Sequence, residues 1–453
     1  MSPVSHVAVL AFPFGTHAAP LLTLVNRLAA SAPDIIFSFF STSSSITTIF
    51  SPTNLISIGS NIKPYAVWDG SPEGFVFSGN PREPIEYFLN AAPDNFDKAM
   101  KKAVEDTGVN ISCLLTDAFL WFAADFSEKI GVPWIPVWTA ASCSLCLHVY
   151  TDEIRSRFAE FDIAEKAEKT IDFIPGLSAI SFSDLPEELI MEDSQSIFAL
   201  TLHNMGLKLH KATAVAVNSF EEIDPIITNH LRSTNQLNIL NIGPLQTLSS
   251  SIPPEDNECL KWLQTQKESS VVYLSFGTVI NPPPNEMAAL ASTLESRKIP
   301  FLWSLRDEAR KHLPENFIDR TSTFGKIVSW APQLHVLENP AIGVFVTHCG
   351  WNSTLESIFC RVPVIGRPFF GDQKVNARMV EDVWKIGVGV KGGVFTEDET
   401  TRVLELVLFS DKGKEMRQNV GRLKEKAKDA VKANGSSTRN FESLLAAFNK
   451  LDS

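Results

Sequence analysis

The sequence has few cysteines, and their spacing indicates neither a disulfide framework nor a metal site. Six cysteines among 453 residues are too few to crosslink a chain of this length. Cys143 and Cys146 have the C-x-x-C spacing, but no second pair and no histidine couplet completes a zinc site. Cys349 and Cys360 lie in apolar contexts typical of buried thiols. We therefore expect these four cysteines to be packing residues.

The chain also lacks an excess of positive charge and a long apolar run. Its net charge is −12, with lysine and arginine spread along its length, so it has no basic footprint for nucleic acid or anionic lipid. No stretch approaches the roughly 18 consecutive apolar residues of a membrane span, and the first residues have no signal-peptide pattern. These absences predict a cytoplasmic protein with no nucleic-acid partner and no stable membrane insertion.

What the sequence does contain is an alternation of apolar runs and helical patterns. At 453 residues the chain exceeds the size at which one core keeps growing, so we expect two domains of about 200 residues each. From His17 onward, Leu21, Val25 and Leu28 recur at helical spacing. The expected strands in this half are His6 to Phe12, Ile35 to Thr42, Ile111 to Asp117, Trp134 to Trp138 and Ala214 to Phe220. Such alternation predicts a parallel sheet covered on both faces.

A segment rich in serine and proline separates this half from the next. We place a linker at 246–256, so that the first domain spans 1–245 and the second begins at 257. The strands expected beyond the linker are Val271 to Thr278, Phe301 to Arg306, Lys326 to Trp330, Ile342 to Cys349 and Val362 to Arg367. The sequence therefore predicts an α/β fold of two doubly wound parallel-sheet domains with a cleft between them.

One literal motif match is misleading. Gly387 to Gly392 (G-V-G-V-K-G) fits the dinucleotide fingerprint G-x-G-x-x-G. That motif must follow a strand and open a helix, whereas this one follows a helical pattern and runs into Val394 and Phe395. We interpret it as a surface turn or short strand, which disfavours a nicotinamide or flavin oxidoreductase.

The run Ile342 to Ser353 (I-G-V-F-V-T-H-C-G-W-N-S) indicates an anion site. A buried strand ends at His348, and Asn352 and Ser353 begin a helix whose free N–H groups and dipole suit a diphosphate. The alternative is structural, because Ser353 and Glu356 have the S-x-x-E spacing of a capping box. Spacing alone leaves both interpretations open.

His17 lies at a predicted strand-to-helix junction, and Asp117 ends another predicted strand of the same sheet. The carboxyl ends of such strands line the ligand crevice, so the two side chains could face each other. The helix dipole at His17 disfavours the imidazolium, and a neutral ring with an aspartate on its second nitrogen can act as a base. The alternative makes Asp117 a helix N-cap and His17 a buried polar residue.

The 44 residues from 330 to 373 carry a resemblance. They run from W-A-P-Q through H-C-G-W-N-S to a closing D-Q, and they resemble the complete signature box of plant secondary-product glycosyltransferases. The motifs F-P-F-G-T-H-A-A-P, T-D-A-F, V-W-T-A, S-F-G-T, S-L-R-D and G-G-V-F-T also resemble those of the flavonoid 3-O-glucosyltransferases, including the ones that act on anthocyanidins.

This resemblance implies a GT-B fold in which the second domain, 257–436, holds a UDP-sugar and a final helix within 437–453 returns to the first. Trp330 would stack on uracil, Ala331 and Gln333 would bond its edge and the ribose, and Glu356 would hold the ribose hydroxyls. The phosphate contacts would be His348, Asn352 and Ser353, and the sugar contacts would be Trp351, Asp372 and Gln373. Thr139 and Thr278 would approach sugar and phosphate from the other side.

The resemblance also makes His17 the general base and Asp117 its partner. The implied reaction moves glucose from UDP-glucose to the 3-hydroxyl of an anthocyanidin or flavonol, with inversion. No D-x-D run marks a metal site, so we predict metal independence and no cofactor beyond the co-substrate. A monomer is expected. The predicted acceptor contacts are Gly15, which stands where relatives often have serine, and Phe119, His148, Phe198 and Phe370.

Three other functions compete with this one. Gln373 is the residue that glucose users of the family usually carry, whereas histidine often accompanies galactose, so a galactosyltransferase or another phenolic acceptor is the near alternative. A UDP-sugar epimerase and a non-catalytic binder of UDP-sugars belong to different classes. The epimerase has no need of an aromatic lining in the first domain, and an inactive relative would have lost His17 or Asp117, which are both present.

Overall fold

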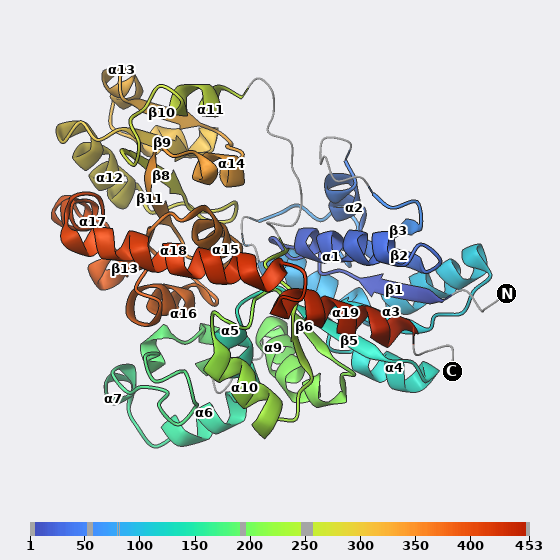
Figure 1. The fold of residues 1–453 in the computed structure, drawn as a ribbon. Helices are drawn as coiled ribbons and strands as arrows, with labels where there is room; N and C mark the ends of the chain where they lie inside the picture. Colours follow the sequence, from blue (N-terminus) through green and yellow to red (C-terminus); the bar gives the residue numbers. More distant parts are fainter. Residues whose placement is uncertain are drawn as a thin grey trace.

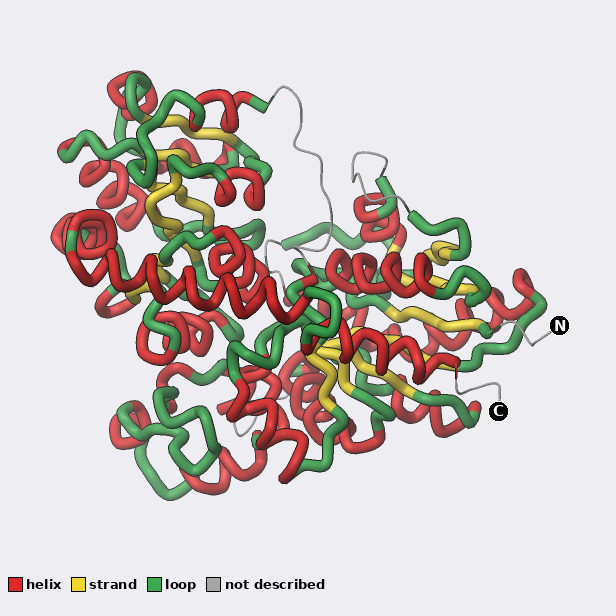
Figure 2. Tube along the Cα trace, viewed as in Figure 1, coloured by secondary structure: helices red, strands yellow, loops and turns green. Residues whose placement is uncertain are grey.

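The protein consists of two α/β domains, each built on a parallel sheet (Figures 1 and 2). The computed structural model describes residues 5–51, 58–78, 80, 82–190, 196–245 and 257–449. The predicted linker at 246–256 lies outside the described residues. No helix in the described ranges is long and apolar enough to cross a membrane. The predicted α/β fold class is confirmed.

The first sheet has the strand order β3-β2-β1-β4-β5-β6-β7, and every neighbouring pair is parallel. Its strands are β1 (His6–Leu10), β2 (Ile36–Thr42), β3 (Ile62–Val67), β4 (Cys113–Asp117), β5 (Trp134–Trp138), β6 (Val215–Val217) and β7 (Ile239–Asn241). β1, β4 and β5 are buried at every position, because helices cover both faces. The order runs outward in both directions from β1 and β4, so the topological switch point lies between these two strands.

The described residues up to 245 form ten α-helices. They are α1 (Ala18–Ser31), α2 (Ser43–Ile49), α3 (Arg82–Thr107), α4 (Ala123–Ile130), α5 (Ser142–Val149), α6 (Thr151–Phe158), α7 (Ile163–Ala167), α8 (Glu187–Ile190), α9 (Ile197–Lys208) and α10 (Pro225–Thr234). The helical spacing predicted for α1 is confirmed, since Leu21, Val25 and Leu28 are all fully buried in one core cluster. Cys143 and Cys146 are free and buried on the opposite face, as packing residues.

The second sheet has the order β10-β9-β8-β11-β12-β13 and is also parallel. Its strands are β8 (Val271–Ser275), β9 (Phe301–Ser304), β10 (Gly325–Val328), β11 (Ile342–Thr347), β12 (Val364–Gly366) and β13 (Gly387–Gly389). The helices that accompany it are α11 (Glu258–Leu263), α12 (Pro284–Ser296), α13 (Phe317–Thr321), α14 (Gln333–Glu338), α15 (Trp351–Cys360), α16 (Gln373–Arg378), α17 (Glu397–Phe409) and α18 (Asp411–Val431). The G-V-G-V-K-G run begins with edge strand β13, so its interpretation as a short strand is confirmed.

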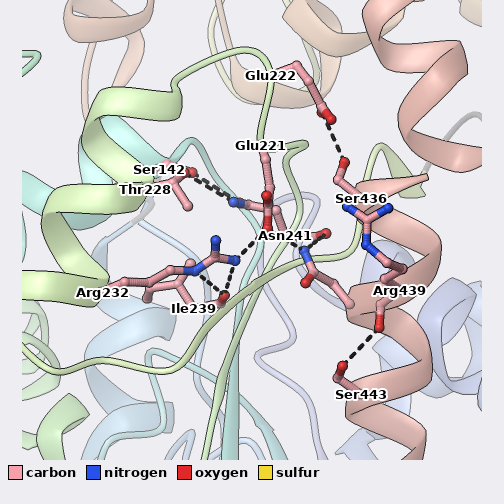
Figure 3. A network of polar contacts seen from close by, with 11 residues as sticks. Ser142, Glu221, Glu222, Thr228, Arg232, Ile239, Asn241, Ser436, Arg439 and Ser443 are labelled. Atoms are coloured by element: carbon pink, nitrogen blue, oxygen red, sulfur yellow. Dashed lines mark hydrogen bonds and ion pairs between the residues drawn. The ribbon is translucent and has the colours of Figure 1, made fainter. Parts of the chain in front are cut away.

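The last helix, α19 (Ser436–Asn449), lies against the first domain rather than the second (Figure 1). Phe441, Leu444 and Phe448 join the core cluster of α1. A polar network holds the start of the helix. The Ser436 hydroxyl donates to Glu222 at 3.0 Å (Figure 3). The Asn440 amide donates to the carbonyl of Asn241 at 2.9 Å. The chain therefore crosses back to its first domain.

Two tryptophans of the second domain also join the domains. The Trp351 indole N–H donates to the carbonyl of Asn218 at 2.7 Å, and the Trp384 indole N–H donates to Asp224 Oδ1 at 3.1 Å. The two rings lie 6.1 Å apart. The second oxygen of Asp224 has no hydrogen-bond partner among the described residues. Burial raises the pKa of this carboxyl to about 7, although Trp384 opposes the shift.

The raised pKa of Asp224 makes the folded state less stable as pH rises. The folded protein binds this proton more tightly than the unfolded chain, so stability is greatest below the unfolded value near 4 and falls as pH rises through about 7. We expect wild-type stability to fall by a few kcal/mol between pH 5 and pH 9 through this group. Asp224→Asn should flatten that dependence in urea unfolding curves, and an unchanged slope would contradict the assignment.

Candidate active site

His17 and Asp117 meet at the switch point of the first sheet. His17 immediately precedes α1 in the loop after β1, and Asp117 is the last residue of β4. His17 Nδ1 lies 2.8 Å from Asp117 Oδ2, while Asp117 Oδ1 accepts from the N–H of Phe119 at 2.9 Å. The N-cap alternative for Asp117 is wrong, because the following helix begins at Ala123 and its N-cap is Phe122. The predicted pairing across the crevice is confirmed.

Asp117 raises the pKa of the His17 imidazole. Burial lowers the pKa of His17, but the attraction and hydrogen bond of Asp117, with a smaller contribution from Asp372, outweigh it and leave the pKa above its usual value. The shift is opposite in direction to the one expected from the helix dipole at the start of α1. Asp117 is 1% exposed and the His17 side chain 23%. With Nδ1–H directed at the carboxylate, Nε2 is the nitrogen with a free lone pair.

Aromatic rings surround the His17 side chain. The ring of Phe119 lies 4.6 Å from it and the ring of Phe12 lies 5.2 Å from it. Phe198, on α9, meets Phe119 edge-on at 5.7 Å. Of the predicted acceptor contacts, Phe119 therefore lies beside His17, and Phe198 lies against Phe119. They offer an apolar surface for a flat ring.

The other predicted acceptor contacts are placed differently. Gly15 is exposed, two residues before His17, with a positive φ of 61°. Phe370 is 46% exposed in the loop before α16. His148 is buried behind Trp138, at a ring distance of 5.6 Å, and burial lowers its pKa to about 4. Since Trp138 stands between His148 and Phe119, His148 is in contact with the lining rather than with the ring of His17.

In the second domain, His348 lies between two glycines. A Cβ on Gly277 would come within 3.0 Å of the His348 ring, and a Cβ on Gly350 within 2.4 Å. Both glycines are therefore required where they occur, in S-F-G-T and in H-C-G-W. Burial lowers the pKa of His348 to about 4, so the ring is neutral at pH 7. Thr278 is exposed and follows Gly277 directly, which places it beside this loop.

The helix start after His348 has no side-chain cap. α15 begins at Trp351 with Gly350 as its N-cap, and no side chain of the described residues caps it. Ser353 and Glu356 instead receive hydrogen bonds from the amide of Gln333, at 3.0 and 2.6 Å. The capping-box alternative is therefore wrong. Burial raises the pKa of Glu356 to about 7, although the Gln333 hydrogen bond opposes this.

The residues expected to contact uracil and ribose lie just before α14, on α14 and on α15. Trp330 follows β10 and is 67% exposed, whereas Ala331 is buried in a core cluster with β8 and β11. Gln333 also accepts from the Tyr273 hydroxyl at 3.3 Å. Gln333 on α14 and Ser353 and Glu356 on α15 thus lie close together, and Trp330, which precedes α14, leaves a large aromatic side chain open to solvent.

The three residues predicted to contact the sugar make different hydrogen bonds in the structure. Asp372 accepts from Asn376 at 2.9 Å, and its charge acts on His17. Gln373 accepts from the N–H groups of Phe369 and Phe370 through Oε1. The indole N–H of Trp351 is used at the domain interface, and the sugar contact of Trp351 stays a prediction.

Sequence reasoning missed one contact at the site, and it expected another residue to contact the donor where the structure places it beside His17. Asn352 Nδ2 donates to Thr16 Oγ1 at 2.9 Å, although 336 positions separate them. Thr16 directly precedes His17, so this bond joins the predicted phosphate site to the loop of the base. Thr139, predicted as a donor contact, lies with its Oγ1 3.2 Å from His17 Nδ1. No periodicity or motif spacing could have indicated either contact.

Comparison with known proteins shows the family of the chain. The family model described as UDP-glucoronosyl and UDP-glucosyl transferase matches residues 80–431. A flavonol 3-O-glucosyltransferase of Actinidia chinensis var. chinensis is 54% identical over 98% of this chain and 97% of its own, and an anthocyanidin 3-O-galactosyltransferase of the same plant is 49% identical over 97% and 96%. A crystal structure of a UDP-glucose: anthocyanidin 3-O-glucosyltransferase in complex with UDP aligns with a TM-score of 0.93 at 39% identity, covering 99% of this chain and 100% of that one. The chain belongs to the UDP-glucoronosyl and UDP-glucosyl transferase family and has its GT-B fold.

Proposed function

We propose that this protein transfers glucose from UDP-glucose to the 3-hydroxyl of an anthocyanidin or flavonol and inverts the anomeric configuration. The observation that carries the proposal is the His17–Asp117 pair, 2.8 Å apart, against the rings of Phe12 and Phe119. The relative with 54% identity is named for transfer of glucose to a flavonol. Metal independence, the domain limits at 245 and 257, action as a monomer and a cytoplasmic location stay predictions.

In this proposal His17 Nε2 takes the proton of the acceptor hydroxyl while its oxygen attacks the anomeric carbon. The new glycosidic C–O bond forms as the bond to the diphosphate oxygen breaks and UDP leaves. Asp117 holds Nδ1–H and stabilises the imidazolium. A phenolic hydroxyl, with a pKa of about 10, loses its proton far more readily than an alkyl alcohol.

The donor lies along the second domain in this proposal. Trp330 stacks on uracil, and Gln333 and Glu356 hold the ribose. The uncapped start of α15, with His348, Asn352 and Ser353, receives the diphosphate, because free N–H groups and the helix dipole favour an anion. Asp372 and Gln373 bind the sugar, and Thr139 and Thr278 approach from the other side.

A product assay tests the proposal against its alternatives. The protein is incubated with UDP-glucose or UDP-galactose and a panel of anthocyanidins and flavonols, and the products are identified. We expect a 3-O-glucoside. A galactoside would replace the predicted sugar, interconversion of the two UDP-sugars without acceptor would indicate an epimerase, and binding without any product would indicate a non-catalytic binder.

Replacement of Trp330 tests the donor position. Trp330→Ala should weaken binding of UDP and of UDP-glucose by the same factor, because stacking on a base is worth about 1–3 kcal/mol, or roughly 5- to 150-fold in affinity. Calorimetric titration with each nucleotide measures it. The matched control is Trp68→Ala, which removes a tryptophan that is 60% exposed in the first domain. Equal affinities in both variants and the wild type would place uracil elsewhere.

A further inference from the structure

We propose that Glu286 and Arg367 are positioning residues that hold the loop 367–373 so that the amide N–H₂ of Gln373 faces the donor sugar. The inference rests on the proposed function, because it takes from it the contact between Gln373 and the sugar. Neither Glu286 nor Arg367 is among the residues expected to contact UDP, the sugar or the acceptor.

The pair is a buried, two-point ion pair. Arg367 Nε lies 3.0 Å from Glu286 Oε2, and Nη2 bonds Oε1. The side chains are 12% and 2% exposed. Glu286 Oε2 also accepts from the N–H of Phe395 at 3.0 Å. Glu286 lies in the first turn of α12, where the helix dipole favours a negative charge. A planar guanidinium bound at two points has one orientation.

That orientation is transmitted to Gln373 through Phe369. The Arg367 guanidinium lies over the Phe369 ring, 4.1 Å from its centroid. The N–H of Phe369 donates to Gln373 Oε1 at 2.9 Å, and the N–H of Phe370 does so at 3.3 Å. Since two N–H donors take the oxygen, the amide nitrogen is the end of Gln373 left to bind another group. Gln373 then acts toward the sugar as a hydrogen-bond donor.

Stability alone does not account for a buried ion pair at this position. Well-packed apolar residues fill such a space at least as favourably, since burying two charges costs most of what their attraction returns. What the pair adds is a fixed geometry in the loop that ends in Asp372 and Gln373. Disturbing the pair should therefore affect recognition of the sugar more than recognition of UDP, which the proposal places on Trp330, Gln333 and the start of α15.

The test compares binding of UDP-glucose with binding of UDP, by calorimetric titration of Glu286→Gln and Arg367→Lys. We expect affinity for UDP-glucose to fall about tenfold, the equivalent of one or two weakened hydrogen bonds, while affinity for UDP stays within about twofold. Arg367→Lys keeps the charge and loses the two-point contact, so it carries the test if Glu286→Gln does not fold. The matched control is Glu405→Gln, which breaks an exposed pair with Arg297 at the other end of α12.

Two results would overturn the inference: an equal loss of affinity for both nucleotides, or no loss for either. Binding is measured without turnover, so the inference is tested separately from catalysis. If the wild-type protein transfers no sugar, the proposed function fails on its own terms, while the ratio of the two affinities still decides the role of Glu286 and Arg367.

Discussion

Replacement of His17 by alanine is expected to lower kcat/KM for glucose transfer by about 10²- to 10⁴-fold, the usual contribution of a general base. Without the imidazole, no group at the end of β1 takes the proton of the acceptor hydroxyl. The affinity for UDP should not change, because the proposed UDP contacts belong to the second domain. Initial rates with UDP-glucose and a flavonol, together with a UDP titration, measure both effects.

The chain offers a matched control for this variant. His203 and Asp152 form a second histidine–aspartate pair, with His203 Nε2 2.7 Å from Asp152 Oδ1, outside the candidate site. His203→Ala should transfer glucose at the wild-type rate. An active His17→Ala variant would remove His17 as the base, and a loss of UDP binding in it would show that the substitution acts through the fold.

The second large effect is expected for Asp117→Asn, in both the rate and its pH dependence. Loss of the carboxylate should lower the plateau of kcat/KM by about 10²- to 10³-fold, because the imidazolium loses its counter-charge. A protonated ring cannot act as a base, so the rate falls at pH values below the pKa of His17. Because that pKa is raised in the wild type, the acid limb of the pH–rate profile should lie above the usual pKa of a histidine. Without Asp117, burial becomes the dominant influence on the pKa of His17 and lowers it. The acid limb of the pH–rate profile should therefore move to lower pH.

The asparagine variant is chosen because it keeps the local turn. Its side-chain oxygen can still accept from the N–H of Phe119, as Asp117 Oδ1 does. The control is Asp152→Asn in the surface pair with His203, which should leave the pH profile unchanged. An acid limb that stays in place, or moves to higher pH, would contradict the assigned cause of the pKa shift.

Much of the fold could be predicted from the sequence, because buried parallel strands leave continuous apolar runs. The predicted runs contain β1, β2, β4, β5 and β6 of the first sheet, with ends displaced by a few residues. The meeting of His17 and Asp117 was one of two interpretations that the same reasoning left open, and the structure shows it. Both residues come at the carboxyl ends of strands, and β1 and β4 are neighbours at the switch point.

Contacts between distant segments could not be predicted in this way. The bonds from Asn352 to Thr16 and from Trp351 to the carbonyl of Asn218 depend on how the domains pack, which no periodicity records. The sign of the His17 pKa shift was missed for the same reason, because it depends on how closely Asp117 approaches. Spacing suggested a capping box at Ser353, and only the fold brings Gln333 into the position that excludes it.

The donor contacts were predicted in two different ways. An anion site at the start of α15 was one of two interpretations that strand and helix signals left open, whereas the uracil, ribose and sugar contacts came from the resemblance alone. The structure brings Gln333 into contact with Ser353 and Glu356 of α15 and leaves Trp330 exposed after β10. The roles of these residues stay predictions until nucleotide binding is measured in the variants.

The most direct test of base-assisted displacement is the anomeric configuration of the product. Glucose is supplied as UDP-α-glucose with a flavonol acceptor, and the glucoside is examined by proton NMR before any side reaction accumulates. A single displacement in which His17 deprotonates the attacking hydroxyl predicts a β-glucoside. An α-glucoside would contradict it, because retention requires two displacements or a reaction on one face of the sugar.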